Sequence, residues 1–107
     1  MTNIIVRTAI NDKEIAEGIV RTLLYERLIS CGQINEIESI YRWREEIVED
    51  KGYLVSMSAR LNDYKFIEKR IKDLHTYELP EISYFEINGS NEFLNWINSS
   101  TAKEINI

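Results

Sequence analysis

Two adjacent stretches of the chain mix apolar and polar residues in a way that predicts two long β-strands. The first stretch runs from Ile34 to Trp43, and the second runs from Lys51 to Ala59. Each stretch carries apolar residues on both parities, so neither face of these strands is purely polar. Strands that are apolar on both faces need cover on both faces. We therefore predict a long β-hairpin that turns across residues 43–47, with a partner subunit covering the face that one small chain leaves bare.

A helix is predicted to follow a first short strand, Ile4–Ala9. Asn11 is the expected N-cap, because Glu14 three positions later is placed to complete a capping box. Apolar residues then recur at spacings of three and four, which predicts one buried stripe and a helix that ends near Ser30. Cys31 and the glycine after it are expected to form the exit from the helix. The residues of this stripe are Ala16, Ile19, Val20, Leu23, Leu24 and Leu28.

Two more helices and one more strand are predicted after the hairpin. Asn62 is the expected N-cap of a helix with apolar residues at helical spacing. Pro80 then leads into a strand over Ile82–Ile87, and Ser90 caps a short final helix. The apolar positions of the two helices are Tyr64, Ile67, Ile71, Leu74, Phe93, Trp96 and Ile97.

The predicted order of elements is strand, helix, strand, strand, helix, strand and short helix. This is the ferredoxin-like βαββαβ arrangement, an α+β fold in which both main helices cover one face of an antiparallel sheet. We expect one such domain over residues 1–99 and a polar, loosely attached tail over residues 100–107. The open face of the sheet and the surplus apolar residues of the hairpin both indicate self-association.

Composition narrows the class of protein. The 107 residues are 44% hydrophobic and 29% charged, as in an ordinary globular domain. The formal net charge of −5 argues against nucleic acid as a partner, because phosphate backbones are bound chiefly by Lys and Arg. No apolar run reaches the roughly 18 residues of a membrane-spanning helix, and the N-terminus lacks the pattern of a signal peptide. We therefore expect a cytoplasmic protein with no membrane partner.

Cys31 and His75 are the candidate metal ligands, with Glu78 close to His75 in sequence. A thiolate together with an imidazole suits copper or zinc. The alternative interpretation is that Cys31 is a small buried hydrophobic residue and that His75 bonds a carbonyl at the end of its helix. The single cysteine excludes an internal disulfide and a cysteine-cluster zinc site within one chain, but a role shared between subunits stays open.

The aromatic residues of the hairpin also have two interpretations. Tyr41, Trp43 and Tyr53, together with Trp96 near the C-terminus, could line a ligand cleft or stack on a base, but aromatic residues in a β-ribbon more often anchor a core or a subunit interface. Glu49 and Asp50 could bind a hard divalent ion, but adjacent residues of a strand point to opposite faces, so a solvated turn is expected instead.

Catalysis is not predicted. The chain has one histidine, no Gly-rich phosphate loop and no carboxylate pair fixed by helical spacing. A nucleophile pair formed by Cys31 and His75 is the one enzymatic alternative. We therefore assign no catalytic residue.

Several stretches of the chain resemble the CutA family of divalent-ion tolerance proteins. The similar stretches keep the order and spacing of the family from about Ile4 to Ser99, so the resemblance spans the whole predicted domain. They are Arg27–Cys31, Ser39–Trp43, Glu46–Lys51, His75–Ile82 and Phe93–Ile97. The resemblance implies a ferredoxin-like subunit in a tight homotrimer, in which the long hairpin supplies the threefold contacts.

The resemblance also implies ligand clefts between subunits. Tyr41, Trp43, Tyr77 and Glu81 match family residues of this cleft, and Cys31, His75 and Glu78 match residues expected to bind copper or zinc weakly. The chain departs from the family at Gly52 in place of a glutamate, Ser58-Ala59 in place of lysine-threonine, Glu45 in place of a turn glycine and Thr76 in place of a proline. The first two departures remove a charged pair from the cleft.

The expected function is that of a CutA-like trimeric binding or sensing module. By resemblance it contributes to tolerance of divalent metal, chiefly copper, through weak binding of a metal or small ligand. No other cofactor is expected. The alternative, from a different class, is a structural scaffold or protein-docking trimer whose ligand site has decayed. A copper and zinc titration of the wild type, Cys31→Ala and His75→Ala separates the two.

Overall fold

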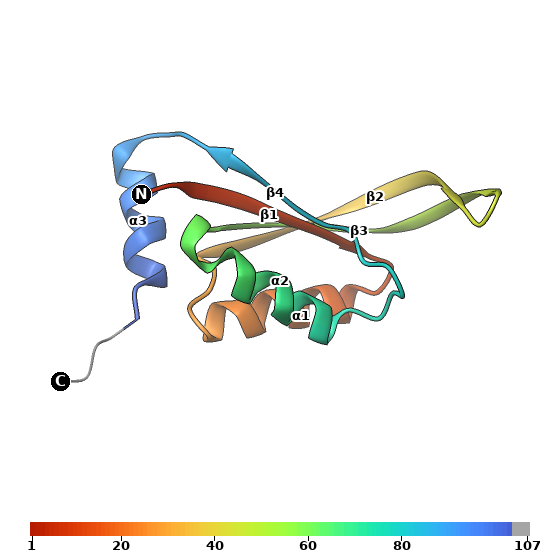
Figure 1. Ribbon diagram of the computed structural model, residues 1–107, viewed down its shortest axis with the longest axis horizontal. Helices are drawn as coiled ribbons and strands as arrows, with labels where there is room; N and C mark the ends of the chain where they lie inside the picture. The colour runs from red at the N-terminus through yellow and green to blue at the C-terminus, as the bar shows by residue number, and fades with distance from the viewer. Residues whose placement is uncertain (104–107) are drawn as a thin grey trace.

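The computed structural model describes residues 1–103 and contains a four-stranded sheet with two helices on one face and a third helix at one end (Figure 1). The strands are β1 (Asn3–Ile10), β2 (Cys31–Trp43), β3 (Glu46–Arg60) and β4 (Ile82–Ile87). The helices are α1 (Lys13–Tyr25), α2 (Tyr64–Leu74) and α3 (Asn91–Thr101), and a 3-10 turn, η1 (Leu61–Asp63), precedes α2. The sheet order is β2-β3-β1-β4, and each neighbouring pair is antiparallel. The predicted α+β, ferredoxin-like fold is confirmed.

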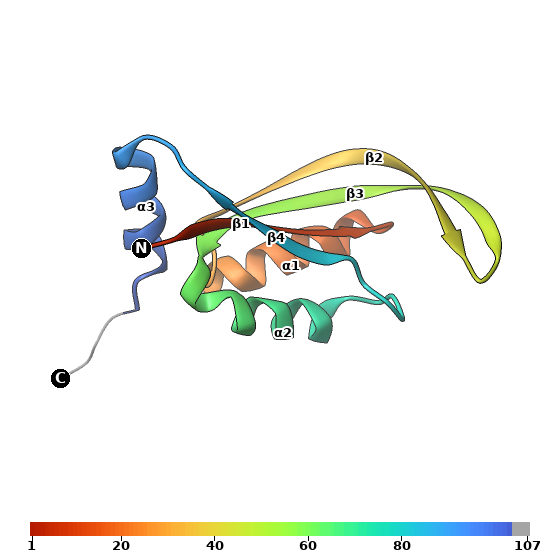
Figure 2. The same cartoon turned by 45° about the horizontal axis from the view of Figure 1, so that its top comes forward.

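The core lies between the sheet and the two helices α1 and α2. Successive residues of a strand point to opposite faces, and the even residues of β1 and odd residues of β3 face the helices. The buried apolar side chains are Ile4, Val6, Ile10, Ala16, Ile19, Val20, Leu23, Leu28, Ile29, Val55, Met57, Ala59, Ile67 and Ile71. The other face of the sheet is covered by neither α1 nor α2 (Figure 2).

Strands β2 and β3 continue past the rest of the sheet as a projecting ribbon (Figures 1 and 2). β3 pairs with β1 only over residues 53–60, so the part from Ile37 to Gly52, here called the distal ribbon, pairs only with itself. The projection makes the molecule long, with extents of 53 × 28 × 20 Å. Its radius of gyration of 14.9 Å exceeds the roughly 13 Å expected for a compact chain of this length.

The hairpin turn is tighter than the sequence predicts. Trp43 pairs directly with Glu46, so that only Arg44 and Glu45 form the turn, both with positive φ (48° and 71°). This is the geometry of a type I′ two-residue turn. The expectation that Glu49 and Asp50 lie in a solvated turn is therefore wrong, because they belong to β3.

Helix α1 does not begin with the predicted capping box. Asp12, and not Asn11, is the N-cap, and its carboxylate accepts a hydrogen bond from the Ile15 N–H at 3.1 Å. The residue that caps a helix is set by where the chain leaves the extended conformation, and Asp12 is still extended (φ −125°, ψ 118°).

Helix α1 also ends earlier than the predicted position near Ser30. Its last residue is Tyr25, and Arg27 then adopts the left-handed conformation with φ 58°. The Leu28 N–H donates to the Leu23 carbonyl at 2.9 Å, which closes the helix in the manner of a Schellman motif. Cys31 therefore opens β2 and is not part of the helix exit.

Helix α2 also starts at a different residue from the one predicted. The predicted N-cap, Asn62, lies inside η1, and the residue at the N-cap position is Asp63. The Asp63 carboxylate makes no capping bond and accepts instead from the Arg60 Nε at 3.0 Å. This ion pair is largely buried, so it joins the end of β3 to the start of α2 away from solvent.

Helix α3 begins as predicted and ends later. The Ser90 side chain accepts from the Phe93 N–H at 3.2 Å, which confirms this N-cap. The helix continues through Ser99 to the buried Thr101, so the predicted tail does not begin at Ser99 or residue 100. Residues 104–107 of that tail lie outside the described residues. None of the helices in the described chain is both long and apolar enough to cross a membrane.

Candidate functional site

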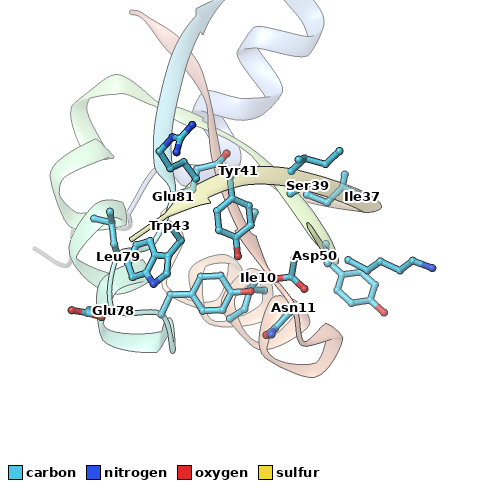
Figure 3. Close-up of a pocket in the computed structure, with 17 residues that line it drawn as sticks. Ile10, Asn11, Ile37, Ser39, Tyr41, Trp43, Asp50, Glu78, Leu79 and Glu81 are labelled. Atoms are coloured by element: carbon cyan, nitrogen blue, oxygen red, sulfur yellow. The ribbon is translucent and has the colours of Figure 1, made fainter. Parts of the chain in front are cut away.

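The distal ribbon and the segment between α2 and β4 enclose a cleft of about 760 Å³ (Figure 3). The end of β1, at Ile10 and Asn11, closes the cleft between these two walls. Its aromatic and charged lining residues are Tyr41, Arg42, Trp43, Asp50, Lys51, Tyr53, Tyr77, Glu78 and Glu81. The volume is in the range of small-molecule sites.

The ribbon wall of the cleft presents two aromatic rings and a carboxylate. Ser39 pairs with Asp50 across the ribbon, so the alternation of side chains puts Tyr41 and Trp43 on the same face as Asp50. Figure 3 shows these side chains directed from the ribbon toward the end of β1. The cleft therefore has an aromatic wall with a half-buried acid set into it.

The basic residues of this wall belong to the opposite face of the ribbon. Arg42 lies between Tyr41 and Trp43, and Lys51 directly follows Asp50. Since neighbouring side chains of a strand alternate, both basic side chains are directed away from the face that carries Asp50. The aromatic rings and Asp50 therefore share one face of the ribbon, and Arg42 and Lys51 line the cleft from the opposite face.

The backbone of β1 passes very close to the ribbon at Gly52. A Cβ atom at this position would lie 2.9 Å from the Ile10 carbonyl oxygen, which is closer than a real Cβ atom approaches. The resemblance to the family implies a glutamate at this position, but here the backbone of β1 occupies the space that its side chain would need. No side chain from this position reaches the cleft.

Tyr77 lies on the wall opposite the ribbon. Burial raises the pKa of its phenol, and the charge of Asp50 and the neighbouring Tyr41 raise it further, while a hydrogen bond with the Asn11 backbone lowers it. Tyr77 lines the cleft together with Asn11 at the end of β1 and with Tyr41 and Asp50 of the ribbon. The ring also packs edge-on against His75, with 4.7 Å between centroids.

Arg44 joins the tip of the ribbon to the loop at the mouth of the cleft. Its Nη2 lies 2.8 Å from the Glu78 carboxylate, and its guanidinium lies 5.3 Å from the centre of the Trp43 ring. Both side chains of the ion pair are highly exposed, at 69% and 72%. An exposed pair of this kind contributes little to stability, but it sets the position of Arg44 over Trp43.

His75 uses both ring nitrogens in holding the loop to β1. Nδ1 accepts the Tyr77 N–H at 3.1 Å, so Nε2 carries the proton and donates to the Ala9 carbonyl at 2.8 Å. His75 does bond a carbonyl, as the alternative interpretation from sequence expects, but this carbonyl belongs to Ala9 of β1 and not to the end of α2. A metal ion on His75 would have to replace one of these two bonds.

Cys31 lies at the other end of the ribbon. It is a free, half-buried cysteine opposite Ser58, and it does not line the cleft. From Ser58 to Asp50 is eight residues along β3, or roughly 26 Å at about 3.3 Å per residue. Cys31 is therefore remote from the cleft of its own chain.

The metal ligands predicted from sequence do not form a metal centre within one chain. Glu78 lines the cleft and pairs with Arg44, whereas Cys31 and His75 are not among the lining residues. Over residues 1–103, no group of three or more His, Cys, Asp and Glu side chains is arranged to hold a metal ion. Binding of a metal by these residues would need ligands from a second subunit.

The four residues predicted for the ligand cleft do come together. Tyr41, Trp43, Tyr77 and Glu81 all line the same cleft, although they lie up to 40 positions apart in the sequence. That the cleft binds a ligand stays a prediction.

Sequence reasoning missed two residues that shape the site. A two-residue hairpin turn at Arg44 and Glu45 would have given the correct strand register, and that register places Asp50 on the same face as Tyr41 and Trp43. Arg44 carried no signal, because its position over Trp43 depends on the tertiary approach of Glu78.

The fold and this cleft define a small ferredoxin-like protein with a ligand-sized cleft beside a projecting β-ribbon. Comparison with known sequences identifies the family. Residues 4–100 match the family described as CutA1 divalent ion tolerance protein, so the chain belongs to the CutA1 family.

Named relatives are similar in sequence over more than nine tenths of the chain. The divalent-cation tolerance protein CutA of Pyrococcus horikoshii is 39% identical over 101 residues, covering 94% of this chain and 99% of the relative. That of Thermus thermophilus is 34% identical, covering 91% and 96%. These names describe a role in tolerance of divalent cations and not a catalysed reaction.

Solved structures share the fold. CutA1 from Pyrococcus horikoshii superposes with a TM-score of 0.88 at 36% identity, covering 94% of this chain and 99% of that one. CutA from Archaeoglobus fulgidus, described as a periplasmic divalent cation tolerance protein, gives 0.91 at 26% identity, covering 94% and 99%. Family membership therefore does not by itself assign a compartment to this chain.

Proposed function

We propose that the protein is a homotrimeric binding or sensing module whose clefts, completed between subunits, bind a small ligand or a divalent metal weakly. In this proposal it acts in the cytoplasm, without catalysis, and contributes to divalent-cation tolerance, chiefly of copper. The observation that carries the proposal is the cleft itself, with its aromatic and acidic face on a ribbon that projects from the rest of the subunit.

Self-association is supported by apolar side chains on the distal ribbon. Ile40 and Ile47 are 70% and 62% exposed, on the face opposite Tyr41 and Trp43. Soluble monomers seldom expose contiguous apolar surface without a partner. Light scattering is expected to give three times the chain mass of 12.6 kDa, and a monomer at micromolar concentration would contradict the proposal.

Metal binding is the part of the proposal that needs the trimer most. Cys31 and His75 lie outside their own chain's cleft, so they would act as ligands only beside groups of a neighbouring subunit. A copper and zinc titration by calorimetry is compared for the wild type, Cys31→Ala, His75→Ala and Glu78→Gln. Copper affinity that is unchanged in all three variants would remove these residues from the proposed site.

A second candidate, a scaffold or protein-docking trimer with a decayed ligand site, is favoured by Gly52. The Ile10 carbonyl fills the space beside Gly52, so the glutamate that the family resemblance implies there has no counterpart in this cleft. The two candidates differ in one measurement. A trimer that binds neither copper, zinc nor any small ligand in the cleft supports the scaffold.

A further inference from the structure

We infer that the cleft beside the distal ribbon binds small molecules that carry a guanidinium group. The inference rests on the proposed function, because it assigns a ligand class to the same cleft. Three features support it: partly exposed aromatic rings, a carboxylate free of basic partners, and the position of the chain's own Arg44.

The aromatic rings are accessible from the cleft. Tyr41, Trp43 and Tyr77 keep 41%, 37% and 36% of their surface exposed although all three line the same space. A guanidinium is planar and weakly hydrated, so it stacks on aromatic faces with a cation–π contribution. The cleft therefore offers surfaces suited to a flat cation.

The charge of the cleft also favours a cation. Asp50 is half-buried beside the rings, and none of the ion pairs among residues 1–103 includes it. Arg42 and Lys51 also line the cleft, but from the other face of the ribbon by strand alternation, and neither forms an ion pair with Asp50. A guanidinium fork matches a carboxylate in geometry as well as charge, so Asp50 is the natural anchor for the ligand.

Arg44 shows that this surface accommodates a guanidinium. Its side chain is at once 5.3 Å from the Trp43 ring centre and 2.8 Å from the Glu78 carboxylate. The arrangement meets both requirements of the proposed ligand, a ring face and an acid. Because the Arg44–Glu78 pair is exposed and weak, a ligand can displace it.

A compact cation is a poorer match. Over residues 1–103 no cluster of three metal-ligating side chains surrounds the space, so a bare metal ion lacks its ligand shell there. An ammonium is a strongly hydrated point charge that does not stack in a plane, so it gains less from the rings than a guanidinium does.

The test compares three matched compounds on one protein. Trp96→Phe leaves Trp43 as the only tryptophan, whose fluorescence then reports binding in the cleft. N-acetyl-arginine amide is expected to bind about tenfold more tightly than its neutral counterpart N-acetyl-citrulline amide. It should also bind more tightly than N-acetyl-lysine amide. Equal affinity for the citrulline or the lysine compound would overturn the inference.

Substitutions locate the binding. Asp50→Asn and Glu78→Gln are each expected to weaken binding of the arginine compound by about fivefold or more. Arg44→Ala should strengthen it, because the internal competitor is removed. Glu92→Gln on α3, an exposed acid outside the cleft, is the control and should change nothing. Unchanged affinity in both Asp50→Asn and Glu78→Gln would also overturn the inference.

The outcomes separate this inference from the proposed function. Light scattering and the copper titration are done on the same preparation. A trimer that binds copper without preferring the arginine compound overturns only the guanidinium assignment. Preference for the arginine compound without copper binding supports the assignment and removes the metal from the proposed function.

Discussion

Three residues other than glycine have positive φ in residues 1–103: Arg27, Arg44 and Glu45. The left-handed conformation costs an L-residue with a Cβ atom roughly 1–2 kcal/mol relative to glycine. Such residues persist because the surrounding structure determines the backbone. At Arg27 the determinant is the end of α1, and at Arg44 and Glu45 it is the two-residue hairpin turn.

Replacing Arg27 by glycine is expected to stabilise the protein. Arg27→Gly relieves the left-handed strain, and the net gain is about 0.5–1 kcal/mol after the added freedom of the unfolded chain is counted. Arg21→Gly, in the interior of the same helix, should instead cost about 1 kcal/mol. Urea unfolding at one fixed protein concentration measures both. A loss of stability in Arg27→Gly would show that its side chain matters more than its backbone.

Tyr64 makes stability depend on alkaline pH. Burial, followed by a hydrogen bond to Glu68, raises the pKa of its phenol from 10 to about 12. The phenol therefore loses its proton more readily in the unfolded chain, and this contribution to stability is complete below pH 10 and lost as pH rises toward 12. Tyr64→Phe should lose less stability than the wild type over that interval. Thermal unfolding scans between pH 10 and 12 measure the difference. Tyr25→Phe is the control, because Tyr25 is 91% exposed and its substitution should leave the pH dependence unchanged.

At the scale of elements, the close approach of β1 to the ribbon fixes the shape of the cleft. Gly52 is the point of contact, because its missing side chain lets the Ile10 carbonyl lie against the ribbon backbone. Gly18, in the middle of α1, is different, since nothing lies within 4 Å of where its Cβ would be. A side chain at Gly52 would therefore clash with β1, whereas a side chain at Gly18 would meet open space.

Alanine substitutions at the two glycines should have effects of opposite sign. Gly52→Ala forces the backbones of β1 and β3 apart and is expected to cost about 1–3 kcal/mol. Gly18→Ala should stabilise by roughly 0.5–1 kcal/mol, because it only raises helix propensity. Differential scanning calorimetry at matched concentration compares them. A neutral Gly52→Ala would mean that β1 can retreat from the ribbon at little cost.

The elements that sequence predicted well are those with local signals. The stripe of α2, the Ser90 cap and most of the stripe of α1 follow from spacing and capping chemistry alone. Two residues of the predicted α1 stripe do not fit, because Leu24 is 39% exposed and Leu28 lies beyond the end of the helix. The end of α1 could not be predicted, because an arginine occupies a position where glycine is usual. The two-residue hairpin turn also lacks the asparagine or glycine that usually marks such a turn. The strand register, and with it the position of Asp50, could therefore not be predicted.

The candidate site was predicted in part for the same reason. Tyr41, Trp43, Tyr77 and Glu81 were grouped by resemblance, and the fold brings them to one cleft. Arg44 and Asp50 depend on the register and on the approach of the loop after α2, which no local pattern encodes.

At the scale of the whole molecule, the distal ribbon is a surface that the rest of the described chain leaves uncovered. Its distal half pairs with no other strand of its own sheet, and apolar side chains stand on both of its faces. Burial of these side chains by neighbouring subunits would remove a large apolar area from water, which is the dominant favourable term in association.

Charges on the ribbon are expected to break the proposed trimer. The double substitution Ile40→Glu with Ile47→Glu puts two acids on one face of the ribbon and should lower the mass measured by light scattering toward 12.6 kDa. Phe66→Glu on α2 is a matched control, because Phe66 is also 62% exposed but lies on the helical side of the subunit. An unchanged mass in the double variant would place the subunit contacts elsewhere.

The hydrogen bonds that hold α3 at the end of the sheet opposite the cleft limit how far the C-terminus can be truncated. Arg60 donates to the Thr101 carbonyl at 3.1 Å while it holds Asp63, and the buried Asn3 side chain donates to Asn98 at 2.8 Å. A chain cut at Ser99 would leave Arg60 without its carbonyl partner in a site that excludes most water. Deletion series and fusion junctions should therefore begin beyond Thr101.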